Sequence, residues 1–147
     1  MSYLNKIKLN NKKVYILGGF GLIGSQVVKN VLSVGAKVII LDVVKKPMQK
    51  NVQFEKFDCS NTEIIEKNFN KIINKLGCPD IFINCSYPRT KDWSQSSFNK
   101  VTLKRMSKNI EIHMNSHAWL SKLVADKMVR NKIKGSIINM TSIYGLL

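Results

Sequence analysis

Residues 14–24 read VYILGGFGLIG, an apolar run that leads into regularly spaced glycines. The first four residues, VYIL, have the length and composition of a buried parallel strand. Beyond Gly21, apolar residues recur every three to four positions, a spacing that predicts a helix with one buried face. Gly18, Gly21 and Gly24 therefore lie where a strand turns into a helix, and Gly19 adds conformational freedom to that turn.

The alternation of strand and helix continues to the end of the sequence. The helix after the glycines is expected to stop at Gly35, since glycine commonly ends helices. The further predicted elements are, in order, a strand from Lys37 to Asp42, a strand from Gln53 to Phe57, a helix capped by Ser60 or Asn61 that runs to about Leu76, a strand from Asp80 to Asn84, a polar loop from Ser86 to Thr102, a helix from about Leu103 to Val129, and a strand from Ser136 to Met140. This order predicts an α/β fold, a Rossmann-type doubly wound parallel sheet of about five strands.

Length and composition indicate the class of protein. A chain of 147 residues fits one domain, residues 1–147, but is short for a dinucleotide enzyme that also carries a substrate pocket. No stretch approaches the roughly 20 apolar residues that cross a bilayer. The polar, lysine-bearing start of the chain lacks the apolar core of a signal peptide. We therefore expect a cytoplasmic protein that has no membrane partner.

The cysteines and histidines were considered as possible metal ligands. Cys59, Cys78 and Cys85 form no CxxC pair and are odd in number, which argues against a disulfide framework and against a zinc site of usual spacing. We expect them to be small buried side chains in a reducing compartment. His113 and His117 stand four residues apart, but no Glu completes an HExxH pattern. The sequence therefore predicts no metal site.

The charge balance is strongly basic. The formal net charge is +15, from 24 Lys and Arg against 9 Asp and Glu, and such a balance is a first sign of nucleic-acid binding. Here the basic residues are scattered, no run exceeds Lys12-Lys13 or Lys45-Lys46, and no aromatic platform is interleaved with them. We interpret them as a solvated surface. A basic polyanion-binding protein remains an alternative, because scattered lysines raise the affinity for phosphates.

The glycine-rich turn has the sequence context of a dinucleotide site. It follows a strand, opens a helix and precedes Asp42 at the end of the next strand, near the usual separation of about 20 residues. Asp42 would accept hydrogen bonds from the ribose hydroxyls and repel a 2′-phosphate, which predicts NAD rather than NADP, although Lys45 and Lys46 weaken that preference. A glycine-rich packing turn with a surface aspartate is the alternative. The turn residues predicted to bind the cofactor are Gly18, Gly19, Phe20, Gly21, Leu22, Ile23 and Gly24.

Glycines at this position have a clear physical role. Without side chains in the way, the backbone can approach a pyrophosphate closely, and the N-terminus of the following helix favours its negative charge.

Further motifs follow in an order that resembles the N-terminal part of the short-chain dehydrogenase/reductase family. In that family the glycine-rich turn is followed by an acid after strand two, an aspartate after strand three, an Asn-Ala-Gly-like turn after strand four, an asparagine inside the long helix and a serine after strand five. The matching residues are Asp42, Asp58, Asn84 with Cys85 and Ser86 in place of Ala-Gly, Asn115 and Ser142. The resemblance extends from Lys13 to Leu147. Residues 83–89 and 141–145 further resemble members of bacterial flagellin-modification and surface-sugar pathways.

The resemblance implies roles for these residues. Asp58 would hydrogen-bond the adenine amino group beside the Cys59 backbone, and residues Asn84, Cys85 and Ser86 would line the adenine ribose and the central crevice. Asn115 would hold the water of a proton relay through its backbone, and Ser142 would orient the substrate carbonyl or alcohol. The implied activity is NAD(P)-dependent interconversion of an alcohol and a carbonyl on a small molecule, with a sugar-like compound as one candidate. Each residue alone also has a structural interpretation, as a helix cap, a buried amide or a turn hydroxyl.

Two departures from the family pattern bear on activity. Leu22 stands where many members carry another glycine, which gives a GxxGxxG variant of the turn. The catalytic Tyr-x-x-x-Lys of the family follows its serine, whereas this chain ends at Leu147, and Tyr144 has no lysine four residues on. We therefore expect a truncated domain that is nearly inert as a catalyst and leaves strand five as an unpaired edge. A catalytically inactive dinucleotide-binding or scaffold module is the alternative, and the helix from Leu103 to Val129 is a candidate surface for homo-oligomers.

Overall fold

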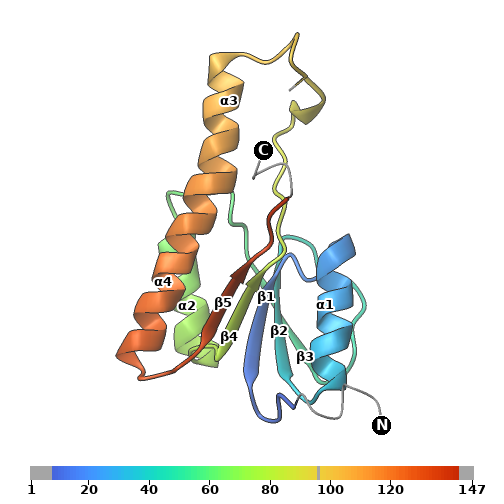
Figure 1. Cartoon of the computed structure of the whole chain (residues 1–147), viewed down its shortest axis with the longest axis vertical. Helices are drawn as coiled ribbons and strands as arrows, with labels where there is room; N and C mark the ends of the chain where they lie inside the picture. Colours follow the sequence, from blue (N-terminus) through green and yellow to red (C-terminus); the bar gives the residue numbers. More distant parts are fainter. Residues whose placement is uncertain (1–7, 96, 143–147) are drawn as a thin grey trace.

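The computed structural model describes residues 8–95 and 97–142. Within them five parallel strands form one sheet in the order β3-β2-β1-β4-β5 (Figure 1). The strands are β1 (Lys13–Leu17), β2 (Lys37–Asp42), β3 (Val52–Lys56), β4 (Ile81–Asn84) and β5 (Ser136–Asn139). The order reverses between β1 and β4, the arrangement of a doubly wound Rossmann-type sheet. The predicted fold class is confirmed.

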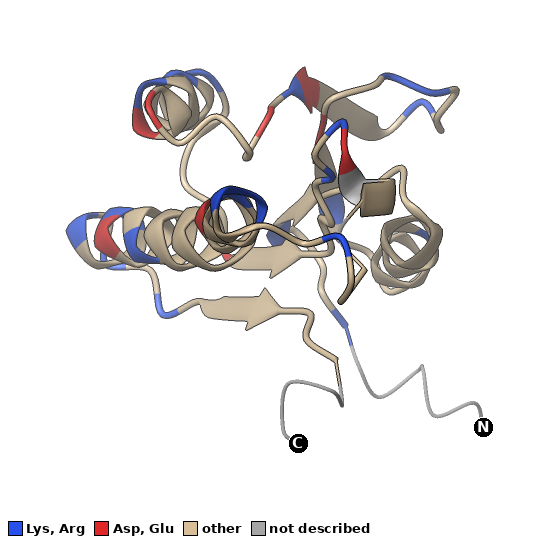
Figure 2. Cartoon of the chain, turned by 90° about the horizontal axis from the view of Figure 1, so that it is seen from above, with Lys and Arg blue, Asp and Glu red and all other residues tan. Residues whose placement is uncertain are grey.

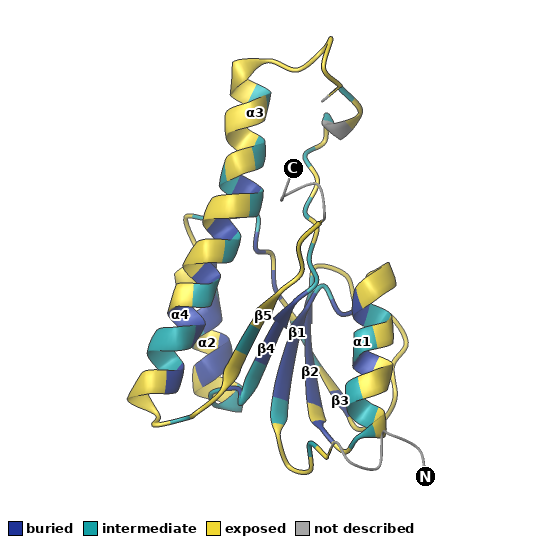
Figure 3. Ribbon diagram, in the orientation of Figure 1, coloured by how far each residue is buried: buried dark blue, intermediate teal, exposed yellow. Residues whose placement is uncertain are grey.

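Helices cover both faces of this sheet (Figure 1). They are α1 (Leu22–Ser33), α2 (Ile65–Leu76), α3 (Leu103–Ile110) and α4 (Ser116–Arg130). On β1, Val14 and Ile16 belong to a core that includes Val28 of α1, whereas Tyr15 and Leu17 belong to a second core shared with α2 and α4. The central strands are therefore buried on both faces (Figure 3), which is why their sequences read as continuous apolar runs.

The last strand lies at an edge. In the part of the chain that the structure describes, β5 pairs only with β4, and Ile138 and Met140 are each 45% exposed. The expectation of a poorly covered strand five agrees with this burial. Tyr144 and the first seven residues of the chain lie outside the described residues.

The start of α2 differs from the prediction. The helix begins at Ile65, and neither Ser60 nor Asn61 caps it. Instead, Asp58 Oδ1 accepts hydrogen bonds from the Ser60 backbone N–H (2.9 Å) and from Ser60 Oγ (2.7 Å). This local turn engages the serine hydroxyl before the helix starts, because short polar side chains compete with helical hydrogen bonds.

The long helix forms, but it is not uniform. A π-helical turn at Glu111–Asn115 joins α3 to α4, and Ser116 Oγ donates to the Ile112 carbonyl at 2.6 Å. The predicted helix from about Leu103 to Val129 is present, but apolar periodicity does not reveal one widened turn within it. Such turns are frequent at functional sites. Figure 1 shows the α3 half extending beyond the carboxyl ends of the strands.

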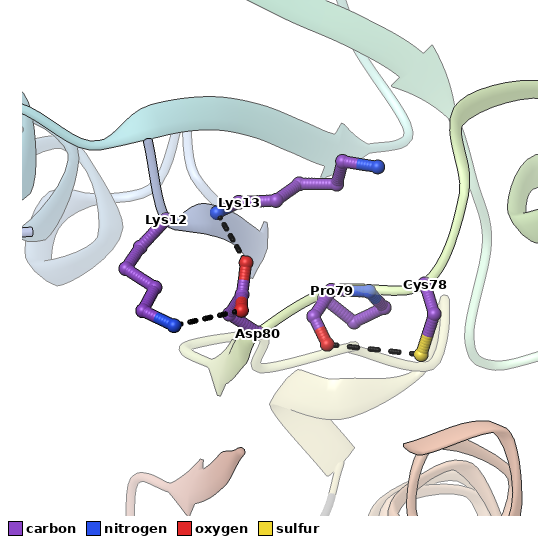
Figure 4. Close-up of polar contacts among 5 residues, drawn as sticks. All are labelled: Lys12, Lys13, Cys78, Pro79 and Asp80. Atoms are coloured by element: carbon purple, nitrogen blue, oxygen red, sulfur yellow. Dashed lines mark hydrogen bonds and ion pairs between the residues drawn. The ribbon is translucent and has the colours of Figure 1, made fainter. Parts of the chain in front are cut away.

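At the opposite end of the sheet, Asp80 links β1 to β4 (Figure 4). Asp80 Oδ2 accepts from the Lys13 backbone N–H at 2.9 Å, and Oδ1 pairs with Lys12 Nζ at 3.1 Å. Burial by itself would raise the pKa of the Asp80 carboxyl, but the Lys13 amide and the Lys12 ammonium outweigh it and hold that pKa below its usual value. Beside this pair, the Cys78 thiol contacts the Pro79 carbonyl.

Replacing Asp80 by Asn should lower the free energy of unfolding by about 1 kcal/mol at pH 7, the usual size for a partly exposed, charge-assisted hydrogen bond. Because the pKa of Asp80 is depressed in the folded state, its contribution is present above the unfolded pKa of about 4 and is lost as the pH falls below it. Urea unfolding at pH 7 and pH 3 measures both effects. The exposed Glu63→Gln variant is the matched control. Equal stability of the two variants at pH 7, or a difference that persists at pH 3, would contradict this expectation.

Candidate functional site

A cleft of about 520 Å³ lies at the carboxyl ends of the first four strands. This is where the strand order reverses, the position at which doubly wound sheets bind ligands. Its lining comes from four segments that are far apart in sequence: Leu17, Gly18, Phe20, Gly21, Leu22 and Ile23 at and after the end of β1; Asp42, Val43, Val44 and Lys46 at and after the end of β2; Phe57, Asp58 and Cys59 after β3; and Cys85, Ser86, Tyr87, Pro88 and Arg89 after β4.

Most of the residues predicted to bind the cofactor meet on this lining. Three of the predicted residues, Gly19, Gly24 and Asn84, are not on the lining. Gly19 is buried against Ile40, Gly24 lies under the Gly18 carbonyl, and Asn84 is only 2% exposed. Sequence order alone does not show which residues of a turn face a cleft, and a cofactor-binding role for these three stays a prediction.

Two glycines are required by close backbone approach. Gly18 has a φ of +73°, and a Cβ at this position would lie 2.8 Å from Ser86 Cα. A Cβ on Gly24 would lie 2.1 Å from the Gly18 carbonyl oxygen. No side chain fits at either place, so the turn after β1 packs directly on the turn after β4 and on the start of α1.

Asp42 is attached to the same turn. Its Oδ2 accepts from the Phe20 backbone N–H at 3.0 Å, and its Oδ1 accepts from the Val43 N–H at 2.8 Å. Lys46 Nζ donates to the Phe20 carbonyl at 3.0 Å. Asp42 and Lys46 therefore bind the backbone N–H and the backbone carbonyl of Phe20. Because each carboxylate oxygen accepts more than one hydrogen bond, Asp42 retains acceptor capacity for a ligand hydroxyl.

Two thiols, those of Cys59 and Cys85, lie on the cleft lining. Burial raises the pKa of Cys59, and contact with Ser86 offsets this only in part. Burial also raises the pKa of Cys85. Cys59 is buried as expected, whereas Cys78 and Cys85 are half-buried, and all three are free thiols. A raised pKa disfavours the thiolate, which is the reactive form of a cysteine. Cys59 and Cys85 therefore contribute mainly apolar surface to the lining.

The candidate catalytic residues lie apart from this lining. Asn115 ends the π-helical turn and, with Thr62, Ala118 and Trp119, borders a second cavity of about 570 Å³. Ser142 is exposed after β5, and Thr141 Oγ1 donates to its carbonyl at 3.3 Å. The described residues therefore assemble a ligand cleft, and neither Asn115 nor Ser142 is part of its lining.

Three polar residues of the lining were missed as candidate site residues, namely Lys46, Tyr87 and Arg89. The Arg89 guanidinium carbon lies 5.7 Å from the Tyr87 ring centroid, and that ring lies 4.9 Å from the ring of His113. The available signal was the polar, aromatic-bearing loop that follows β4, because loops at the carboxyl ends of parallel strands carry ligand contacts.

In the described ranges, no group of three or more His, Cys, Asp or Glu side chains could hold a metal ion. None of the helices described here combines the length and the apolar character needed to cross a bilayer.

The sequence profile of the short chain dehydrogenase family matches residues 12–147. The chain therefore belongs to the short-chain dehydrogenase family, as the order of its motifs indicated. Among curated relatives, the post-translational flagellin modification protein A of Campylobacter coli is 23% identical over 94% of this chain and 58% of the relative. This match confirms the resemblance that residues 83–89 and 141–145 suggested.

Solved structures agree with this assignment. A short chain dehydrogenase from Leptospira borgpetersenii with bound NAD+ has a TM-score of 0.81 and 28% identity, over 99% of this chain and 56% of that chain. A 4-hydroxyisoleucine dehydrogenase complexed with NADH has a TM-score of 0.75 and 28% identity, over 93% of this chain and 58% of that chain. The chain thus spans a little over half the length of these proteins.

Proposed function

We propose that this chain is the dinucleotide-binding part of an NAD(P)-dependent oxidoreductase that interconverts an alcohol and a carbonyl on a small molecule. The observation that carries the proposal is the single cleft that joins the glycine-rich turn to Asp42 and Asp58. The NAD+ and NADH named for two structural neighbours support a nicotinamide dinucleotide as the ligand. A cytoplasmic location and a sugar-like substrate are parts of the same proposal.

The residues of the cleft suit the chemical groups of such a cofactor. The backbone of the turn at Gly18 to Gly24 presents no side chain at its two tightest points, so it can approach a pyrophosphate at the N-terminus of α1. Asp42 would accept hydrogen bonds from ribose hydroxyls, and Asp58 lies on the lining where the adenine amino group would need an acceptor. The bound nicotinamide would supply the hydride. We propose NAD as the preferred form, because the Asp42 carboxylate repels a 2′-phosphate.

Reduction of a carbonyl also requires a proton donor. No Tyr-x-x-x-Lys follows Ser142 within the 147 residues. Tyr87 and Lys91 have that spacing, but Pro88 and the non-helical conformation of this segment do not place them on one helix face. We therefore propose that these 147 residues bind the dinucleotide and do not turn it over.

The exposed side of the long helix supports the proposal of a homo-oligomer. Large apolar side chains at helical spacing are exposed along it, namely Leu103, Met106, Ile110 and Met114. Contiguous exposed apolar side chains of this kind often mark a contact surface.

A titration with NADH, followed by nicotinamide fluorescence, tests the proposed function. We expect saturable binding that is tighter for NADH than for NADPH and changes little with salt. The basic alternative predicts binding to polyphosphate that weakens steeply with salt and is indifferent to NADH. Figure 2 shows Lys and Arg on helices and loops around the molecule, so the described charges do not gather at one place. Failure of NADH to bind the folded chain would contradict the proposal.

A further inference from the structure

A partly buried polar network connects the long helix to the turn after β4. Asn84 Oδ1 accepts from the Ser86 backbone N–H at 3.0 Å and from Ser86 Oγ at 2.7 Å. Ser86 Oγ lies 3.1 Å from His117 Nε2, on α4, and 3.5 Å from the Cys59 thiol. The carboxyl ends of two strands, β3 and β4, and one helix thus meet at one hydroxyl group.

The direction of each hydrogen bond follows from the donors available. The Ser86 N–H can only donate, so the Asn84 atom that faces it is the carbonyl oxygen, which can only accept. The Ser86 hydroxyl proton must therefore point to Asn84 Oδ1. It follows that His117 Nε2 is the donor in its contact with Ser86 Oγ, and that neutral His117 carries its proton on Nε2.

With these bonds the Ser86 hydroxyl is saturated. A serine hydroxyl offers one proton and two lone pairs, and here Asn84, His117 and the Cys59 thiol use them. Ser86 is on the cleft lining, and its hydroxyl is engaged by these three partners.

The Ser86 backbone is also the surface on which the glycine-rich turn rests. A Cβ at Gly18 would lie 2.8 Å from Ser86 Cα and 2.9 Å from Ser86 N, so a small shift of Ser86 displaces Gly18. Glycine stands at the place of Ser86 in the pattern that this sequence resembles, and glycine has no hydroxyl to anchor. The hydroxyl anchor at Ser86 therefore has no counterpart in that pattern.

We infer that His117 is a positioning residue for the dinucleotide cleft, which holds Ser86 through its Nε2–H and thereby fixes the backbone against which Gly18 packs. This inference rests on the proposed function, because it concerns the affinity of the cleft for a nicotinamide dinucleotide. His117 acts through Ser86 and is not itself on the cleft lining.

The experiment compares two substitutions of His117 that differ in whether the new side chain can donate a hydrogen bond to Ser86 Oγ. In His117→Gln the amide nitrogen can occupy the place of Nε2 and still donate, whereas His117→Leu keeps a similar volume and removes the donor. We expect His117→Leu to weaken NADH binding about tenfold, the effect of losing one hydrogen bond, and His117→Gln to remain within about twofold of the unaltered chain. NADH fluorescence titrations at pH 7.5 give the dissociation constants, and urea unfolding of each variant gives the stability.

A second arm separates positioning from general stability. Ser86→Ala removes the acceptor, so we expect it to weaken NADH binding as His117→Leu does, and the double variant to bind no more weakly than either single one. If His117→Leu does not fold, Ser86→Ala and His117→Gln still decide the matter. Unchanged NADH affinity in His117→Leu or in Ser86→Ala, or full additivity in the double variant, would overturn the inference alone. An unaltered chain that does not bind NADH would overturn the proposed function as well.

Discussion

Replacing Gly24 by alanine is expected to abolish dinucleotide binding and to lower the free energy of unfolding by about 3 kcal/mol or more. The added Cβ would lie 2.1 Å from the Gly18 carbonyl oxygen and 2.9 Å from Gly19 Cα. Both neighbours are backbone atoms, so relief requires the turn itself to move, and overpacking of this kind typically costs about 1–3 kcal/mol or more. Alanine is the better helix former by about 1 kcal/mol, which is too little to offset the clash.

Gly21→Ala is the matched control for this variant. Gly21 is exposed, and the nearest atom to its added Cβ is the Gly18 carbonyl oxygen at 3.1 Å. We expect its stability to change by less than about 1 kcal/mol, while NADH binding weakens, because the new methyl group faces the cleft lining. Urea unfolding and NADH titration of both variants provide the comparison. A Gly24→Ala protein as stable as Gly21→Ala would show that the turn is not packed as described.

Replacing Asp42 by asparagine should weaken NADH binding about tenfold, as expected for loss of charge-assisted hydrogen bonds to a ribose. Asparagine keeps one carbonyl oxygen to accept the Phe20 N–H, whereas the hydrogen bond from the Val43 N–H is lost together with the charge. With the repulsion gone and Lys46 beside the same peptide, NADPH should bind more tightly than it does to the unaltered chain. The ratio of NADH to NADPH affinity is therefore expected to fall to one or below.

Asp58→Asn is the companion variant, because Asp58 lies on the same lining without contacting the glycine-rich turn through a hydrogen bond. The adenine is common to both dinucleotides, so this change should weaken NADH and NADPH binding by similar factors. Fluorescence titrations of the two variants with the two cofactors measure all four affinities. An unchanged NADH to NADPH ratio in Asp42→Asn would exclude Asp42 as the residue that distinguishes the cofactors.

The sheet could be predicted from sequence because its signals are local and strong. The strand from Lys37 to Asp42 is an apolar run closed by an acid, and it forms with those bounds. Because both of its faces are buried, the strand is a continuous apolar run, and it can be recognised without an alternation of apolar and polar residues. The position of Asp42 near the glycine-rich turn also followed, because carboxyl ends of parallel strands share one edge of a sheet.

Other features depend on contacts that a sequence does not display. The widened turn before Asn115 and the late start of α2 each reflect competition between side-chain and backbone hydrogen bonds, at Ser116 and at Asp58. The link from His117 to Ser86 spans 31 positions and becomes visible only when α4 packs beside β4. Helical spacing places His117 beside His113, and their ring centroids lie 6.2 Å apart, but the hydrogen-bond partner of His117 lies on another segment.

The most direct test of a dinucleotide cleft is to follow backbone amide resonances of the 15N-labelled chain during titration with NAD+. We expect the amide resonances of Gly18, Phe20, Gly21 and Ser86 to shift together along one saturating curve. Gly77 and Gly135 serve as internal controls, because neither lies on the cleft lining. Their amides should remain in place. Absence of shifts at the glycine-rich turn, or larger shifts at Gly77 and Gly135, would contradict the assignment of this cleft to a nicotinamide dinucleotide.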